Sequence, residues 1–172
     1  MNKFTIFITL TGYQIVWLAC VFGEIKFNTP SLGIYVGITF LIIYFYFNKN
    51  KVNFIRTSLL ISIPGYIFDT LIVFLNVYEF KTTFLLGTLP IWMIVLWLSF
   101  STLFDKIFII FSKYKLLGII LSGSLAPLTY YVGEPIGIIK IHNLFLFFLI
   151  MVIFWVSLMI YYQNIILKKI QF

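Results

Sequence analysis

Six long apolar stretches, separated by short polar segments, dominate the pattern of this chain. A helix that crosses a bilayer core of about 30 Å needs about 20 mostly apolar residues, and each stretch meets or approaches that length. The stretches are apolar on all sides, as helices buried in a membrane are. They cover roughly residues 4–23, 31–47, 57–78, 84–103, 116–132 and 143–163. The pattern predicts an all-α, polytopic membrane bundle of six transmembrane helices.

The connections between the stretches are short and contain turn-forming residues. Residues 48–51 and 113–115 interrupt the apolar pattern on one side, and residues 28–30 and 133–135 interrupt it on the other. No segment alternates apolar and polar residues over about ten positions, which argues against a transmembrane barrel. We therefore expect residues 1–172 to form a single transmembrane domain.

Composition excludes several classes of protein. Of the 172 residues, 62% are hydrophobic and 10% are charged, whereas a soluble domain is about 45–50% apolar and about 25% charged. A soluble globular domain, a nucleic-acid-binding protein and a disordered tail are therefore not expected. The single cysteine, Cys20, excludes an intrachain disulfide and a cysteine-based metal site.

The distribution of basic residues predicts the orientation in the membrane, because lysine and arginine accumulate in cytoplasmic loops. One set of connecting segments holds nine of the twelve basic residues: Lys3, Lys49, Lys51, Arg56, Lys106, Lys113, Lys115, Lys168 and Lys169. The other set holds three: Lys26, Lys81 and Lys140. Both termini are therefore expected in the cytoplasm, which agrees with an even number of spans. The expected location is the inner (plasma) membrane of a bacterium.

Asp69 is the most informative polar residue. It lies 13 positions after Arg56 in the third stretch, or about 20 Å along a helix at 1.5 Å per residue. An acidic side chain at the centre of a membrane helix costs about 2.5–3.5 kcal/mol, so it is expected to face the interior of the bundle. Either it holds helices together by hydrogen bonds, or it acts as a general acid or base or anchors a ligand. It is our candidate catalytic residue.

The sequence offers no lysine or arginine at the depth of Asp69, so its partners should be neutral donors. The candidates are Gln14 and Trp17 on the first stretch, Ser99 on the fourth and Tyr130 on the fifth. Gln14 and Trp17 are preferred as hydrogen-bond partners. Together with Asp69, these four residues are the predicted ligand-binding residues.

Other features favour structural roles. Gly118, Ser122 and Ala126 are spaced four apart, which predicts a ridge that lets another helix approach closely. The outer connections hold three acidic residues and a histidine, for which solvent exposure is expected in preference to metal binding: Glu24, Glu79, Glu134 and His142. The sequence contains no Walker A, GxSxG or HExxH motif. We therefore expect neither a metal nor a cofactor.

The order of these landmarks resembles a family of small bacterial membrane proteins catalogued as domain of unknown function 2878. The matching segments are YQIVWLACVFG, PGYIFDTLI with the buried acid, LPIWMIVLWLSF, and GSLAPLTYYVGEPIG. The resemblance covers roughly residues 4–140. It implies an inner-membrane protein of six or nearly six spans, without an established activity, and a loose association with lipid-modifying enzymes such as methyltransferases that resemble cyclopropane-fatty-acid synthases. No family role is transferred to Glu134.

Three functions remain open. The first is a non-enzymatic membrane protein that binds a lipid or other apolar ligand between its helices. An accessory role in lipid modification is left open for this protein. The second is a membrane-embedded lipid-modifying enzyme that uses Asp69 as general acid or base, with Gln14 or Tyr130 orienting the substrate. The third is a small transporter or its substrate-binding subunit. The aromatic-rich interior, with a few polar groups at depth, favours the first. The expected partners are membrane lipids, with a protein partner in the membrane left open and no nucleic acid.

Overall fold

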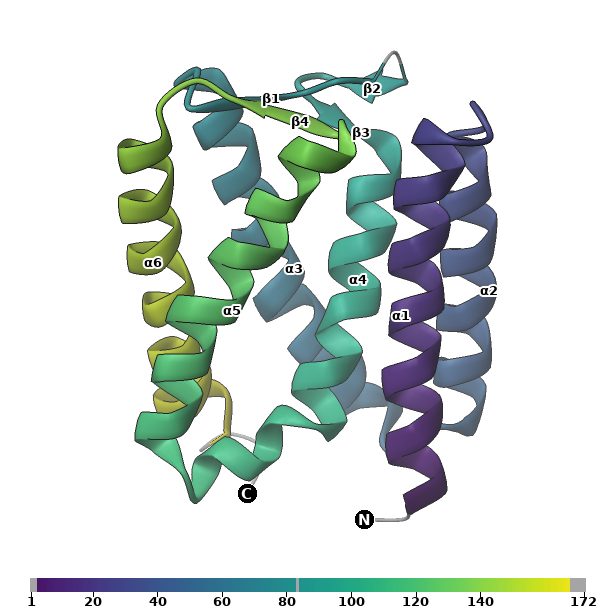
Figure 1. The fold of residues 1–172 in the computed structure, drawn as a ribbon. Helices are drawn as coiled ribbons and strands as arrows, with labels where there is room; N and C mark the ends of the chain where they lie inside the picture. The colour runs from purple at the N-terminus through teal and green to yellow at the C-terminus, as the bar shows by residue number, and fades with distance from the viewer. Residues whose placement is uncertain (1–2, 83, 168–172) are drawn as a thin grey trace. The chain divides into compact units, whose positions relative to one another are not determined.

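The computed structural model describes residues 3–82 and 84–167, which are mostly helical. Within these residues the chain forms six α-helices (Figure 1), namely α1 (Lys3–Ile25), α2 (Ser31–Phe47), α3 (Lys51–Phe74), α4 (Ile91–Lys106), α5 (Lys115–Ile136) and α6 (Leu144–Tyr161). The expected all-α class and the number of helices are confirmed. Four of the described segments are long and apolar enough to cross a membrane: Thr5–Ile25, Lys51–Phe74, Lys115–Ile136 and Leu144–Ile165. The helices α2 and α4 are shorter, with 17 and 16 residues.

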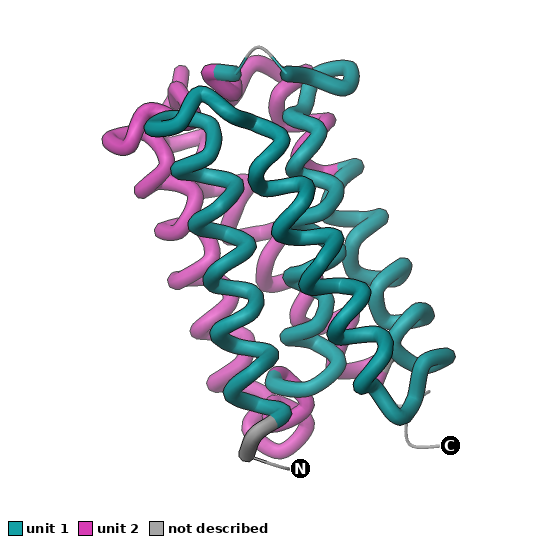
Figure 2. Tube along the Cα trace, turned by 90° about the vertical axis from the view of Figure 1, so that its right-hand side faces the viewer, with its two compact units in different colours: residues 1–67, 82–107 teal, residues 68–81, 108–172 magenta. Residues whose placement is uncertain are grey.

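The chain divides into two compact units, which Figure 2 distinguishes by colour. Unit 1 consists of residues 1–67 and 82–107, and unit 2 consists of residues 68–81 and 108–172. The boundary falls inside α3, so the first part of this helix belongs to unit 1 and its last turns belong to unit 2.

In unit 1 the helices α1, α2 and α4 pack against one another (Figure 1). The contact between α1 and α2 is close because α2 has a glycine where it crosses α1. A Cβ atom at Gly33 would lie 2.7 Å from the Cα atom of Cys20, which is itself fully buried. At the end of α1 the carboxylate of Glu24 accepts a hydrogen bond from Nε1 of Trp92 at 3.0 Å and fixes the start of α4 against α1.

The fourth helix begins later than the apolar pattern suggests. Residues 84–103 read as one apolar stretch, but the described chain forms two short paired strands, β2 (Leu85–Leu86) and β3 (Leu89–Pro90), before α4 begins at Ile91. Gly87 adopts a φ of 68° at the first position of the two-residue turn, a conformation that glycine adopts without steric cost. Pro90 precedes the helix and has no N–H to donate.

In unit 2 the helices α5 and α6 pack together, and two strands join the loops at their ends (Figure 1). The strand β1 (Tyr78–Phe80) pairs antiparallel with β4 (Ile139–Ile141). Each strand follows a helix that ends at a left-handed residue: Asn76 with a φ of 57° after α3, and Gly137 with a φ of 93° after α5. In each case the N–H of the following residue bonds back to a carbonyl of the last helical turn, as in a Schellman motif: Val77 to Ile72, and Ile138 to Gly133. The third apolar stretch, expected to extend to residue 78, is therefore helical only to Phe74.

The expected ridge on α5 is found in part. Gly118 packs closely against the short helix η1 (Phe108–Ser112) and the π-helical turn η2 (Tyr162–Ile166), because a Cβ atom there would lie 2.7 Å from Cγ of Phe111 and 2.8 Å from Nε2 of Gln163. Ser122 is half-buried and donates a hydrogen bond to the carbonyl of Ile119 in its own helix.

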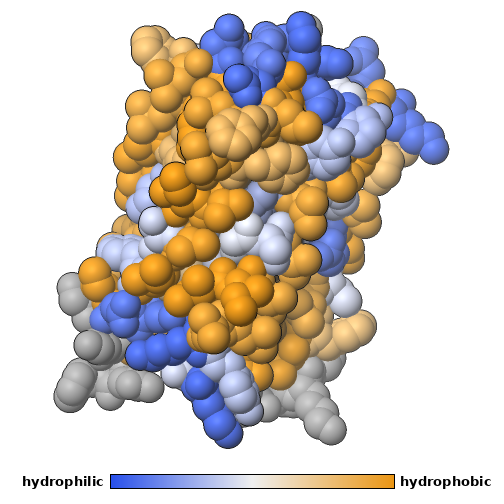
Figure 3. All heavy atoms as spheres, turned by 60° about the vertical axis from the view of Figure 1, so that its left-hand side comes forward, coloured by the Kyte–Doolittle hydropathy of each residue, from blue (hydrophilic) through white to orange (hydrophobic). Residues whose placement is uncertain are grey.

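Large apolar side chains are exposed on the helices of both units. Val52 at the start of α3 is 80% exposed, and Phe145 at the start of α6 is 79% exposed. Figure 3 shows one face of the molecule, on which hydrophobic residues cover much of the surface. Extended apolar surface of this kind marks contact with a membrane or with another protein.

Candidate functional site

Asp69 is fully buried in unit 2, where two tyrosines donate hydrogen bonds to its carboxylate. The hydroxyl of Tyr78 lies 2.8 Å from Oδ1, and the hydroxyl of Tyr130 lies 3.1 Å from Oδ2. The three residues come from the last turns of α3, from β1 and from α5. A carboxylate accepts hydrogen bonds at both oxygens, so the two phenols stabilise a polar group that would otherwise be unsatisfied in an apolar interior.

The local backbone explains why Tyr78 reaches back to Asp69. The left-handed residue Asn76 ends α3, and the N–H of Val77 bonds to the carbonyl of Ile72 at 3.2 Å, so the chain reverses. The pairing of β1 with β4 then holds Tyr78, which is fully buried, opposite Ile141.

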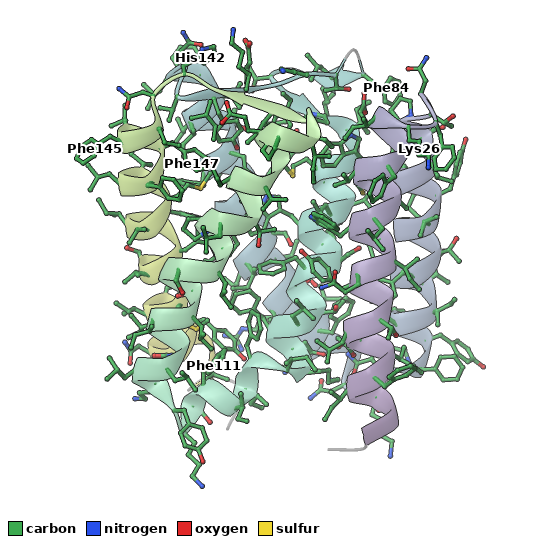
Figure 4. All side chains as sticks on the ribbon, viewed as in Figure 1. Lys26, Phe84, Phe111, His142, Phe145 and Phe147 are labelled. Carbon is green, nitrogen blue, oxygen red and sulfur yellow. The ribbon has the colours of Figure 1, made fainter. Side chains whose placement is uncertain are left out.

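Aromatic side chains surround this carboxylate site. The ring of Phe147 on α6 contacts the ring of Tyr78 in an edge-on arrangement, with centroids 6.1 Å apart. Figure 4 shows Phe147 on the side of α6 that faces α5, whereas Phe145 points outward. Burial and then the neighbouring carboxylate of Asp69 raise the pKa of Tyr78 well above its usual value. The phenol of Tyr78 therefore stays protonated and remains a hydrogen-bond donor.

Of the predicted partners of Asp69, Tyr130 forms a hydrogen bond with it, whereas its other tyrosine partner, Tyr78, was not predicted. Tyr78 was not anticipated because the third apolar stretch reads as one helix through residue 78. Gln14, Trp17 and Ser99 belong to unit 1, and their role as partners of Asp69 stays a prediction. The side chain of Gln14 is exposed, while Ser99 is fully buried.

Unit 1 contains a second buried carboxylate, Asp105, which the sequence pattern did not single out. Asp105, at the end of α4, accepts hydrogen bonds at Oδ2 from the hydroxyl of Tyr44 and from Nδ2 of Asn48, both at 2.9 Å. The ammonium of Lys106 lies 2.7 Å from the same oxygen. The ends of α2 and α4 are thereby joined by a charged, hydrogen-bonded cluster.

An open apolar groove of about 500 Å³ lies between α2 and the first turns of α3 in unit 1. Its lining is hydrophobic except for Tyr46, Lys51 and Ser58. The lining residues are Ile38, Leu41, Ile42, Phe45, Tyr46, Lys51, Phe54, Ile55, Ser58, Leu59 and Leu98. A volume of about 300–1,000 Å³ and a mainly apolar lining with few polar groups are typical of sites for small ligands.

The outer acidic residues take part in separate interactions within their units. Glu79 lies 3.8 Å from the ammonium of Lys140 and 3.6 Å from Nε2 of His142. Glu134 accepts a hydrogen bond from the backbone N–H of Ile141 at 3.0 Å. Within residues 3–82 and 84–167, no group of three histidine, cysteine or acidic side chains is arranged to hold a metal ion.

Comparison with known proteins identifies one family and leaves its activity open. A family model described as "Protein of unknown function (DUF2878)" matches residues 6–161, which confirms the resemblance inferred from the four sequence segments. Neither the curated proteins nor the solved structures include a match.

Proposed function

The chain belongs to the protein family of unknown function DUF2878, and we propose that it is an integral membrane protein that binds a lipid between its helices. In this proposal all six helices cross the inner membrane of a bacterium and both termini lie in the cytoplasm. The length and apolar character of four of the helices support the membrane location. The unequal distribution of basic residues supports the orientation.

The apolar groove of unit 1 is the observation that carries this function. Its walls belong to α2 and α3, and several of their side chains are exposed, including Ile42 at 64% and Ile55 at 47%. Leu98 of α4 is also part of the lining. In a bilayer, a groove open along its side admits an acyl chain directly from the surrounding lipid.

Filling the groove tests this function. Ile42→Trp adds bulk to a groove wall, and Ile43→Trp is the matched control because Ile43 is the next residue of α2 and does not line the groove. Native mass spectrometry after extraction in a mild detergent should find lipid bound to the wild type and to Ile43→Trp, and much less lipid on Ile42→Trp. Equal lipid occupancy in all three proteins would contradict the proposal.

A second candidate function rests on Asp69. Carboxyl and phenol side chains both serve as general acids or bases in enzymes, and the buried Asp69 accepts hydrogen bonds from two phenols at 2.8 and 3.1 Å. If the chain is a lipid-modifying enzyme, Asp69→Asn should fold normally and abolish the change in lipid composition that the wild type causes when expressed in cells. Mass spectrometry of the extracted lipids measures this change. Identical lipid profiles for cells with and without the wild-type protein would exclude this function.

A further inference from the structure

We propose that the groove of unit 1 selects an anionic glycerophospholipid, with Lys51 binding the phosphate and one acyl chain lying between α2 and α3. The inference rests on the proposed lipid binding and adds the class of headgroup and the direction in which the lipid lies. It follows from the position of a single charge, from the length of the apolar walls and from the open side of the groove.

The charge lies at one end of the groove. Lys51 is the first residue of α3, and among the described lining residues it alone carries a formal charge. Its ammonium lies 5.7 Å from the centroid of the Phe45 ring, a cation–π contact that holds the side chain beside the groove. Among the described residues it forms no ion pair, so its N–H groups are available to an anion. A cation at the end of an apolar channel complements a phosphate attached to an acyl chain.

The apolar walls have the length of an acyl-chain segment within one leaflet. On α2 the lining extends from Tyr46 back to Ile38, and on α3 it extends from Lys51 to Leu59. Each wall covers nine residues, and the eight steps between its first and last residue correspond to about 12 Å at 1.5 Å per residue. One leaflet of a hydrocarbon core about 30 Å thick measures about 15 Å. A chain lying along these walls therefore keeps its polar end at Lys51 and its methyl end towards the membrane centre.

The open side favours a phospholipid of the surrounding leaflet as the occupant. One acyl chain fills the groove while the second chain stays in the bilayer beside the exposed side chains of Ile42 and Ile55. In the proposed orientation Lys51 is cytoplasmic, and the cytoplasmic leaflet carries anionic lipids. Lysine interacts with phosphate as a point charge, so arginine should replace it.

Competition between two lipids with identical acyl chains tests the headgroup. The purified protein is incubated with equal amounts of phosphatidylglycerol and phosphatidylcholine, and native mass spectrometry measures the ratio in which the two are retained. The wild type should retain more phosphatidylglycerol. Lys51→Gln should lower this preference about fivefold, which corresponds to about 1 kcal/mol for one lysine near a lipid surface.

Two control variants distinguish a specific contact from general attraction. Lys49→Gln removes the same charge two residues away, from an exposed side chain that does not line the groove, and should keep the preference. Lys51→Arg should keep it as well. Equal losses in Lys49→Gln and Lys51→Gln, or no loss in Lys51→Gln, would overturn the inference.

The same measurement separates this inference from the proposed function. If both lipids bind equally to the wild type and Ile42→Trp reduces the binding of both, lipid binding stands and the headgroup assignment is wrong. If the wild type retains neither lipid, both proposals are wrong. Melting temperatures of all variants, measured in the same detergent, identify any variant that has lost its fold.

Discussion

At the scale of single residues, Asp69 shows how the chain accommodates an acid among apolar helices. Two phenols donate to its two carboxylate oxygens, and both phenols come from the same unit. Tyr78 is as fully buried as Asp69, so each of these groups would lose a buried partner if the other were removed. An unsatisfied buried polar group costs more than its hydrogen bond contributes.

We expect Asp69→Leu to lower the free energy of unfolding by about 1–3 kcal/mol, because it leaves the Tyr78 hydroxyl without its acceptor. Asp69→Asn retains an acceptor oxygen and should cost less. Thermal unfolding in detergent measures both effects. Adding Tyr78→Phe to Asp69→Leu should restore part of the loss, since the unsatisfied hydroxyl is removed. A melting temperature of Asp69→Leu equal to that of the wild type would contradict this account.

The cluster at Asp105 gives a second prediction at this scale. Tyr44 is buried and donates to a carboxylate that also binds Asn48 and Lys106. Tyr44→Phe should therefore destabilise the protein by about 1.5–3 kcal/mol, the range for a hydrogen bond to a charged group. Tyr46→Phe makes the same chemical change two residues away on a side chain that is 74% exposed, and should stay within about 0.5 kcal/mol of the wild type. Chemical denaturation of the two variants gives the comparison, and equal losses would argue against the cluster.

At the scale of elements, left-handed residues determine where α3 and α5 end. Asn76 and Gly137 each reverse the chain directly into a strand, and the two strands pair. The N–H of Ile138 bonds to the carbonyl of Gly133 at 2.9 Å, which satisfies a carbonyl of the last turn of α5. These helix ends bring Tyr78 back towards Asp69, so the carboxylate site depends on the geometry of a turn as well as on helix packing.

The close contact of α1 with α2 leads to the third prediction. Gly33→Ala would place a methyl group 2.7 Å from the backbone of Cys20, so the helices must separate. Overpacking of this kind costs about 1–3 kcal/mol, which outweighs the gain of about 1 kcal/mol when alanine replaces glycine in a helix.

Gly133→Ala is the matched control for this contact. A Cβ atom at Gly133 would lie 3.4 Å from Cγ1 of Ile139, an ordinary van der Waals separation. The melting temperature of Gly133→Ala should therefore equal or slightly exceed that of the wild type, while that of Gly33→Ala should fall. A stable Gly33→Ala protein would show that the two helices readily move apart.

At the scale of the whole molecule, the proposed topology gives the fourth prediction. An alkaline phosphatase or green fluorescent protein reporter fused after Phe172 should report a cytoplasmic location, and one inserted near Lys81 should report an external location. The reason is the excess of basic residues in one set of connecting segments. An external C-terminus would contradict both the six spans and the orientation. The alternative, with α2 or α4 outside the membrane, would place the Lys81 reporter or the C-terminus on the opposite side.

The sequence by itself determined the all-α fold class of this protein and the approximate extent of its helices. Apolar runs of about 20 residues are a local property of the chain, so they are visible without tertiary contacts. The expected stretch 31–47 has the same bounds as α2. The order of four short segments along the chain also sufficed to predict the family, which the match over residues 6–161 confirms.

Tertiary structure decided which residues meet. Tyr78 joins Asp69 only because Asn76 reverses the chain and β1 pairs with β4, more than 50 residues away in sequence. Hydropathy does not distinguish a helix from a turn or short strand that continues the same apolar run, which is why residues 75–78 and 84–90 were expected to be helical. The sequence did not indicate a role for Asp105, because its hydrogen bonds come from Tyr44 in α2 and from Asn48 just after that helix. The groove likewise depends on the space between two helices, which no pattern in either helix contains.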